Sequence, residues 1–233
     1  MQRGIIKAPF FEVGPKAFLY GEKMLKLALE LDRIALKYNV DIILTPQYTD
    51  IYPLAQKTKH IHIFAQHMDC LSVGRGLGSV LPEAVKAAGA DGVMLNHAEK
   101  KLTLEVIGKT IIRAKEVGLL TIVCGDTIEE LQAIARLNPD MIVAEPTELI
   151  GTGRMSDLSY IKDCIKIIKD INPEIMVLPA AGIGNGNDVY NVIKAGAEAT
   201  GSTSGIIKAP NPAAMAEEMI SAVRRAWDER NAF

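Results

Sequence analysis

Short apolar segments alternate along this chain with longer segments whose apolar residues recur every three or four positions. The short segments are rich in Val and Ile and apolar on both faces, which is typical of buried parallel strands. They predict strands at residues 10–14, 40–44, 61–65, 92–96, 119–124, 141–145, 175–179 and 197–201. The longer segments predict helices at residues 16–38, 51–57, 80–88, 102–117, 128–137, 156–171, 187–195 and 212–227.

Eight strands, each followed by a helix, predict an α/β protein with a (β/α)8 barrel. A doubly wound sheet is the alternative, but that architecture usually has fewer strands and does not account for eight near-regular units. No Gly/Ser-rich linker, charge block or low-complexity tract divides the sequence. We therefore expect a single domain over residues 1–233, with its chemistry at the carboxyl ends of the strands.

Composition and charge narrow the class of function. Hydrophobic residues make up 48% of the 233 residues, enough for a large core, and aromatics only 5%. With a formal charge of −2 and no basic cluster, neither nucleic acid nor a membrane is an expected partner. Cys70, Cys124 and Cys164 are far apart and show neither zinc-ligand spacing nor a disulfide pattern. These features, and an N-terminus without a long apolar run, favour a cytoplasmic protein.

Glu145 ends the predicted sixth strand and opens a loop that runs to Gly151-Thr152-Gly153. A carboxylate followed by a hinged loop suits abstraction of a carbon-bound proton away from water, because the apolar Leu149-Ile150 pair can cover the site. A carboxylate at the rim with no catalytic role is the alternative. The loop favours Glu145 as a general base.

His97 follows the predicted fourth strand and Asn96. A structural histidine is one interpretation. Nearby helical N–H groups would instead favour a neutral imidazole that polarises a carbonyl group. No second His or carboxylate lies at metal-ligand spacing, so we expect no metal.

Charged and glycine-rich segments follow other strands. Lys16 and Glu99 could pair across the barrel mouth and hold an ammonium group near an anionic substrate, although both could be solvated charges. Segments 181–186 and 201–205 are glycine-rich and follow the last two strands, where barrels often bind phosphate through backbone N–H groups.

Several segments, in barrel order, make the chain similar to the triosephosphate isomerase family, especially its short archaeal-type branch, and so to the TIM barrel fold. The resemblance covers nearly the whole chain and is carried by residues 44–50, 64–69, 80–85, 95–99 and 145–153. It implies an aldose–ketose isomerase of central carbohydrate metabolism that needs no cofactor and acts on a small sugar phosphate. It also implies a homodimer or homotetramer.

The resemblance also implies roles for individual residues. Glu145 would be the base, His97 the neutral electrophile, and Lys16 the cation that binds phosphate and offsets enediolate charge. Glu99 and Asn96 would support Lys16 and His97. The remaining substrate and phosphate contacts would come from Gly14, Gly151, Gly182, Gly184, Thr203 and Ser204.

The chain departs from the family pattern around the expected site. Gly14 stands where the family usually has Asn, Ala98 and Gly184 where it has Ser, and Leu77 where a Thr crosses the dimer interface. Loss of one oxyanion donor typically costs roughly 10²–10³ in turnover. Either the enzyme is a weaker triosephosphate isomerase, or the volume beside Gly14 accepts a longer ketose phosphate such as a tetrulose phosphate.

Two further hypotheses remain open from the sequence. A lyase or aldolase would need a Schiff-base lysine, for which Lys16 is the candidate. A non-catalytic sugar-phosphate-binding protein would explain the altered surroundings, but it would not need both Glu145 and His97.

Overall fold

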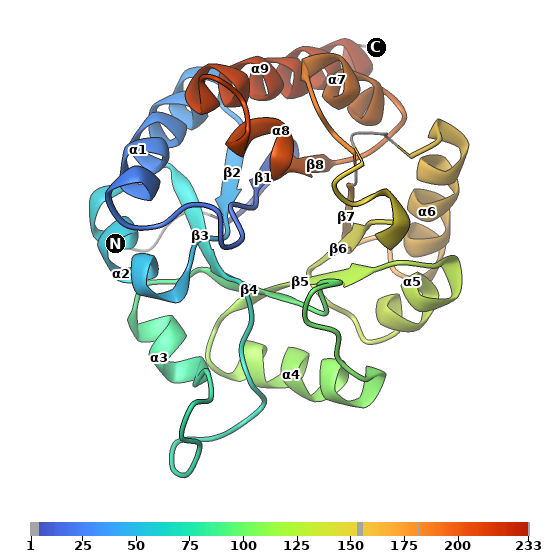
Figure 1. Ribbon diagram of the computed structural model, residues 1–233. Helices are drawn as coiled ribbons and strands as arrows, with labels where there is room; N and C mark the ends of the chain where they lie inside the picture. Colours follow the sequence, from blue (N-terminus) through green and yellow to red (C-terminus); the bar gives the residue numbers. More distant parts are fainter. Residues whose placement is uncertain (1–4, 153–155, 181, 233) are drawn as a thin grey trace.

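The computed structural model describes residues 5–152, 156–180 and 182–232, and within them eight parallel strands form a barrel enclosed by helices (Figure 1). The strands are β1 (Phe10–Val13), β2 (Asp41–Leu44), β3 (Ile61–Ala65), β4 (Gly92–Leu95), β5 (Leu120–Gly125), β6 (Met141–Ala144), β7 (Met176–Pro179) and β8 (Ala199–Ser202). The helices are α1 (Gly21–Tyr38), α2 (Tyr48–Lys57), α3 (Pro82–Ala87), α4 (Leu104–Glu116), α5 (Ile128–Ala135), α6 (Leu158–Ile171), α7 (Gly186–Lys194), α8 (Ser204–Ile207) and α9 (Pro212–Asn231), with a 3-10 turn η1 at Thr147–Leu149. The predicted single-domain (β/α)8 barrel is confirmed.

The strands follow one another around the barrel, and β8 pairs back onto β1. Parallel ladders join each neighbouring pair from β1 to β7, as well as β8 to β1. Between β7 and β8 the described residues show no ladder, and the Thr200 hydroxyl instead donates to the Pro179 carbonyl at 2.7 Å. The ring therefore closes through a side chain at this seam.

Side chains alternate between two cores along each strand, because successive residues point to opposite faces. In β1, Phe10 packs inside the barrel while Phe11 and Val13 pack against the outer helices. The inner core contains Phe10, Ile43, Phe64, Met94, Ile122, Cys124, Met141, Val143 and Leu178. The barrel is thus filled with side chains below the carboxyl ends of its strands.

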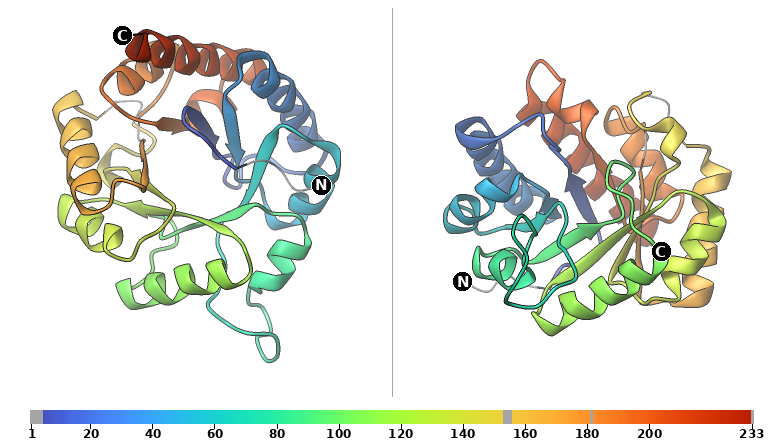
Figure 2. Two further views of the ribbon diagram at one scale, coloured as in Figure 1. Left: turned by 180° about the vertical axis from the view of Figure 1, so that it is seen from behind. Right: turned by 60° about the horizontal axis from the view of Figure 1, so that its bottom comes forward.

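Polar residues begin several of the outer helices. Thr103, Thr127, Asp157, Asn185 and Asn211 each accept a hydrogen bond from a backbone N–H in the first turn of α4, α5, α6, α7 and α9. Seen from the opposite end in Figure 2, the same ring of helices surrounds the strands. No helix of the described ranges combines the length and apolar composition needed to cross a bilayer.

The element boundaries differ from the sequence prediction mainly near residue 16. Lys16 does not begin a helix: its φ of 49° is left-handed, and α1 starts only at Gly21. The Asp50 carboxylate accepts the Gly21 N–H at 3.0 Å and so fixes this later start. Lys16 therefore sits in a loop over the barrel opening. Gly153, the expected end of the loop after β6, lies outside the described residues.

Candidate active site

A cavity of about 380 Å³ opens at the carboxyl ends of the strands, as the barrel architecture predicts. Its wall includes the side chains of Lys16, His97, Glu99 and Glu145. Its floor reaches members of the inner core, namely Met94, Cys124, Val143 and Leu178. The polar groups therefore stand over an apolar floor, where low local polarity strengthens their electrostatic interactions.

Glu145 and His97 face each other in this cavity. The His97 Nε2 atom lies 3.9 Å from a Glu145 carboxylate oxygen, and the two side chains are only 16% and 17% exposed. Glu145 follows β6, and its N–H donates to the Gly125 carbonyl of β5. The carboxylate thus projects from the rigid end of the sheet, with room for a reacting group beside the imidazole.

The surroundings of His97 favour a neutral imidazole that carries its proton on Nε2. The Glu99 backbone N–H donates to His97 Nδ1 at 3.1 Å, so that nitrogen acts as an acceptor. Burial lowers the pKa of His97, and the positive charge of Lys16 lowers it further. The lowered pKa favours the neutral imidazole that the sequence predicts. Burial is its largest cause, whereas the helix expected next to His97 begins only at Leu104.

Burial raises the pKa of Glu145, whereas it lowers that of His97. Desolvation raises the pKa of the Glu145 carboxyl, and the nearby Glu99 and Asp126 charges add to this effect against the opposing charge of Lys16. A raised pKa makes the ionised carboxylate a stronger base than an exposed glutamate.

Lys16 pairs with Glu99, as the sequence predicts, with 2.9 Å between Nζ and Oε1. The hydrogen bond from Lys16 lowers the pKa of the Glu99 carboxyl. The left-handed backbone at Lys16 is stabilised by Gln47 and Gln66, whose amides donate to the Lys16 carbonyl at 2.8 and 2.9 Å. A strained residue held by neighbouring side chains is a frequent feature of functional sites.

Asn96 lies beneath the cavity and is 1% exposed. Its side-chain amide donates to the Cys124 carbonyl and to Glu130, each at 2.9 Å, and its oxygen accepts the Leu102 N–H. These bonds tie the segment that carries His97 to β5 and α5. Asn96 is not among the residues that line the cavity, and its hydrogen bonds hold the backbone that leads to His97.

The expected phosphate contacts are only partly brought together. Thr203 lines the cavity, whereas Gly151, Gly182, Gly184 and Ser204 are not among its lining residues. The Gly184 N–H already donates to the Asp188 carboxylate at 2.9 Å. A phosphate group at Gly184 would have to displace this carboxylate, which the sequence pattern did not reveal.

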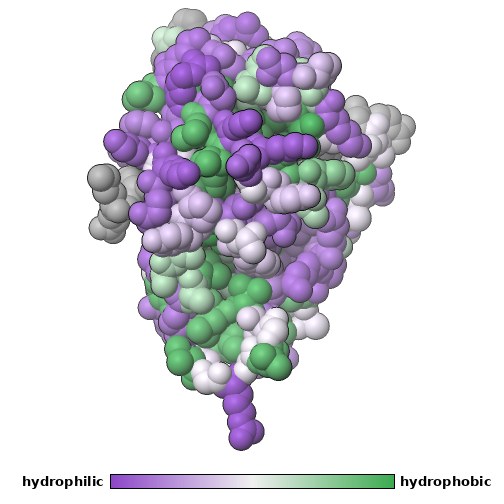
Figure 3. All heavy atoms as spheres, turned by 60° about the vertical axis from the view of Figure 1, so that its left-hand side comes forward, coloured by the Kyte–Doolittle hydropathy of each residue, from purple (hydrophilic) through white to green (hydrophobic). Residues whose placement is uncertain are grey.

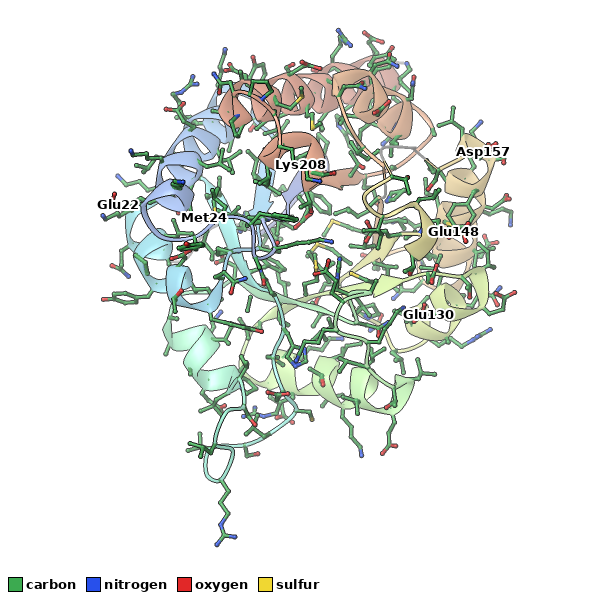
Figure 4. The ribbon with its side chains drawn as sticks, viewed as in Figure 1. Glu22, Met24, Glu130, Glu148, Asp157 and Lys208 are labelled. Atoms are coloured by element: carbon green, nitrogen blue, oxygen red, sulfur yellow. The ribbon has the colours of Figure 1, made fainter. Side chains whose placement is uncertain are left out.

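The loop after β6 is held at its start. Asp126 accepts the Thr147 N–H at 2.9 Å and the Thr147 hydroxyl at 2.7 Å, which fixes η1 against the end of β5. Figure 4 shows Glu148, in η1, and Lys208, after α8, on the rim of the barrel opening.

Sequence reasoning missed Glu12. This carboxyl group points into the barrel, lines the cavity and is 8% exposed. The signal was present, because a charged residue interrupts the apolar strand Phe10–Val13 at an inward position. The Glu12 carboxyl also lies beside Gly14, where an added Cβ would lie 3.0 Å from Glu12 Oε1. Glu12 therefore takes part of the space expected beside Gly14, and Gly14 still lines the cavity.

Comparison with known proteins gives one consistent result. The family model described as "Triosephosphate isomerase" matches residues 16–219. A triosephosphate isomerase of Methanobacterium bryantii is 40% identical over 87% of this chain and 91% of its own length. The triosephosphate isomerase of Sulfurisphaera tokodaii is 34% identical over 97% of this chain and 100% of its own length. That of Saccharolobus solfataricus is 35% identical over 95% of this chain and 99% of its own length. Glu12 and Gly14 precede the span that the family model matches.

Proposed function

The chain belongs to the triosephosphate isomerase family, and on that premise we propose that it interconverts glyceraldehyde 3-phosphate and dihydroxyacetone phosphate through a cis-enediolate. The observation that carries the proposal is the facing pair in the cavity, with His97 Nε2 3.9 Å from the Glu145 carboxylate and Nδ1 occupied by the Glu99 N–H. A base and a neutral hydrogen-bond donor at this spacing can act on adjacent carbon and oxygen atoms of one substrate.

In the proposed mechanism, Glu145 removes a proton from the carbon next to the carbonyl group and returns it to the former carbonyl carbon. His97 donates from Nε2 to the oxygen that gains charge and moves the oxygen protons between the two positions. Lys16 offsets the negative charge of the enediolate and of the phosphate, and its bond to Glu99 keeps its ammonium group in place. Asn96 holds the His97 segment.

Phosphate binding involves Lys16 and the segment that follows β8. Lys16 and Thr203 line the cavity, and Ser204 begins α8 directly after Thr203. We propose that closure of the loop after β6 brings the Gly151 backbone N–H to the phosphate group. The phosphate would also displace the Asp188 carboxylate from the Gly184 N–H. Gly182 and Gly14 would provide further contacts with the substrate. The loop would also exclude water from the enediolate.

A Schiff-base mechanism is less well supported. An amine that attacks a carbonyl group must be unprotonated, whereas the Lys16 ammonium bonds to Glu99 at 2.9 Å.

We further propose that the enzyme is a homo-oligomer that works in the cytoplasm. The loop between β3 and α3 projects from the barrel, and Val73 and Leu77 on it are 72% and 107% exposed. Figure 3 shows hydrophobic atoms gathered at this end of the molecule. An apolar loop of this kind is suited to burial against a second copy. Cys70, Cys124 and Cys164 are all free thiols, which suits a reducing compartment.

Isomerisation of glyceraldehyde 3-phosphate, coupled to a dehydrogenase, tests the function. We expect turnover by the purified protein and a loss of at least 10³-fold in Glu145→Gln, which keeps the side-chain shape but removes the base. Equal rates in the two proteins would exclude Glu145 as the base. No turnover by the unaltered protein would exclude the reaction.

A further inference from the structure

Glu12 occupies an inward position of β1, between Phe10 in the inner core and Gly14 at the cavity. Its neighbours across the sheet are Ile43 in β2 and Gly201 in β8. A carboxyl group in the interior of a barrel is costly unless something uses or satisfies it.

The Glu12 carboxyl group fits into the barrel because Gly14 and Gly201, which lie next to it, have no side chains. A Cβ on Gly201 would lie 2.8 Å from Glu12 Oε2, and a Cβ on Gly14 would lie 3.0 Å from Oε1 and 3.2 Å from the Thr203 hydroxyl. Any larger residue at Gly201 would collide with Glu12. The carboxyl group thus sits where a side chain on Gly14 would otherwise reach into the cavity.

The two Glu12 oxygens differ in their surroundings. Oε1 accepts a hydrogen bond from the Thr45 hydroxyl at 2.8 Å. Oε2 has no hydrogen-bond partner among the residues that the structure describes, and Glu12 lines the cavity that also holds His97 and Glu145. A carboxylic acid that accepts through one oxygen and carries its proton on the other would offer that proton to a ligand.

Burial, more than the surrounding charges, favours the neutral form of Glu12. Burial raises the pKa of Glu12 to about 7; the Thr45 hydrogen bond and the Lys16 charge oppose the rise, and the Glu145 charge adds to it. On β5, the Cys124 thiol also has a pKa raised by burial, so it adds no negative charge. Thr45 after β2 and the Gly201–Thr203 segment at the end of β8 present no ionisable group.

We propose that the Glu12 carboxyl group replaces the side chain absent at Gly14 and donates a hydrogen bond from Oε2 to the oxygen of the substrate that becomes the enediolate oxygen. Donation needs no covalent change at Glu12. Lys16 and Thr203 would bind the phosphate group of the substrate, and Glu12 would contact the oxygen on the reacting carbon. This inference rests on the proposed function, since it assigns a second oxyanion donor beside His97.

Two substitutions of nearly equal size separate donation from packing. Glu12→Gln keeps the length and an N–H donor but does not ionise, and Glu12→Met keeps the length but has no donor. Turnover of glyceraldehyde 3-phosphate should stay within about tenfold in Glu12→Gln and fall roughly 10²–10³-fold in Glu12→Met, with KM changed only a few-fold. The kcat of the unaltered enzyme should decline above about pH 7 relative to Glu12→Gln. Equal kcat values in the two variants would overturn the proposal.

A binding experiment keeps the result independent of turnover. Calorimetry with 2-phosphoglycolate, a phosphorylated carboxylate that mimics the enediolate, should show at least tenfold weaker binding by Glu12→Met than by Glu12→Gln. Inorganic phosphate should bind both variants equally, and their melting temperatures show whether each is folded. If the unaltered protein lacks isomerase activity but this difference in binding holds, the proposed function fails and the donor role of Glu12 stands. If the two variants bind 2-phosphoglycolate equally, the donor role fails even in an active isomerase.

Discussion

The buried carboxyl group of Glu12 makes a specific prediction about stability and pH. Its ordinary pKa of 4.5 rises to about 7 in the folded protein, mainly because burial disfavours the charged form. Between these values the folded protein holds a proton that the unfolded chain has released. The stability that Glu12 contributes is therefore fully present below pH 4.5 and is lost as the pH rises through 7.

The magnitude follows from the same values. Each tenfold change in proton affinity is worth about 1.4 kcal/mol, so Glu12 should reduce the free energy of unfolding by roughly 2–3 kcal/mol between pH 5 and pH 8. Glu12→Gln removes this titration without removing the side chain. From pH 5 to pH 8 the unaltered protein should therefore lose roughly 2–3 kcal/mol more of its free energy of unfolding than Glu12→Gln loses.

Urea unfolding at pH 5 and pH 8, at one fixed protein concentration, measures this difference. Carboxyl groups that do not interact with Glu12 titrate in both proteins and cancel. Glu145 does interact with Glu12, so the comparison is repeated in a Glu145→Gln background. Glu22→Gln, at an exposed position in the first turn of α1, controls for the loss of one negative charge. A difference between variant and unaltered protein that stays constant within about 0.5 kcal/mol would refute the reasoning. It would mean that Glu12 ionises near its ordinary pKa, and Oε2 would then lack the proton that the donor role requires.

Three other predictions concern the proposed enzyme. Glu145→Asp should lower kcat at least 100-fold with little change in KM, because the base withdraws by about one methylene from the reacting carbon; steady-state kinetics with unchanged kcat would contradict this. In the pH profile of kcat/KM, activity should be lost as the pH falls through a value above 4.5, since burial raises the pKa of Glu145 and the base must be ionised; an acid limb at or below 4.5 would contradict it. Leu77→Glu should reduce the mass measured by light scattering, with Leu36→Glu, at a leucine of α1 that is 64% exposed, as a control that makes the same chemical change; an unchanged mass in Leu77→Glu would place the interface elsewhere.

The sequence and the structure give different accounts of the space around Gly14. The sequence predicts that the absence of an asparagine side chain leaves free space at this position. In the structure Glu12, two positions earlier, takes part of that space, because residues two apart on a strand point the same way. Replacing Gly14 with Asn alone would therefore bring a side chain against Glu12. The two positions are coupled and their substitutions should not be additive.

The sequence by itself determined the barrel and the positions of its main groups. Buried parallel strands need continuous apolar segments, and helices need apolar residues at every third or fourth position, so the order of elements could be read from local pattern. Because carboxyl ends of parallel strands meet at one edge, Glu145, His97 and Lys16 could be expected to converge. The Lys16–Glu99 pair followed from the same reasoning and is observed.

Only the tertiary structure decided the pKa values and backbone conformations of those groups, and which side chains lie between them. The left-handed backbone at Lys16 depends on two amides from other loops, Gln47 and Gln66. The engagement of Gly184 by Asp188, and the fit of Glu12 between Gly14 and Gly201, arise from side chains whose positions no local pattern specifies. The pKa shifts of Glu12, His97 and Glu145 arise mainly from burial, and the Lys16 charge on the loop after β1 acts on all three groups. Desolvation and packing depend on all neighbours in space, whereas periodicity reports only neighbours along the chain.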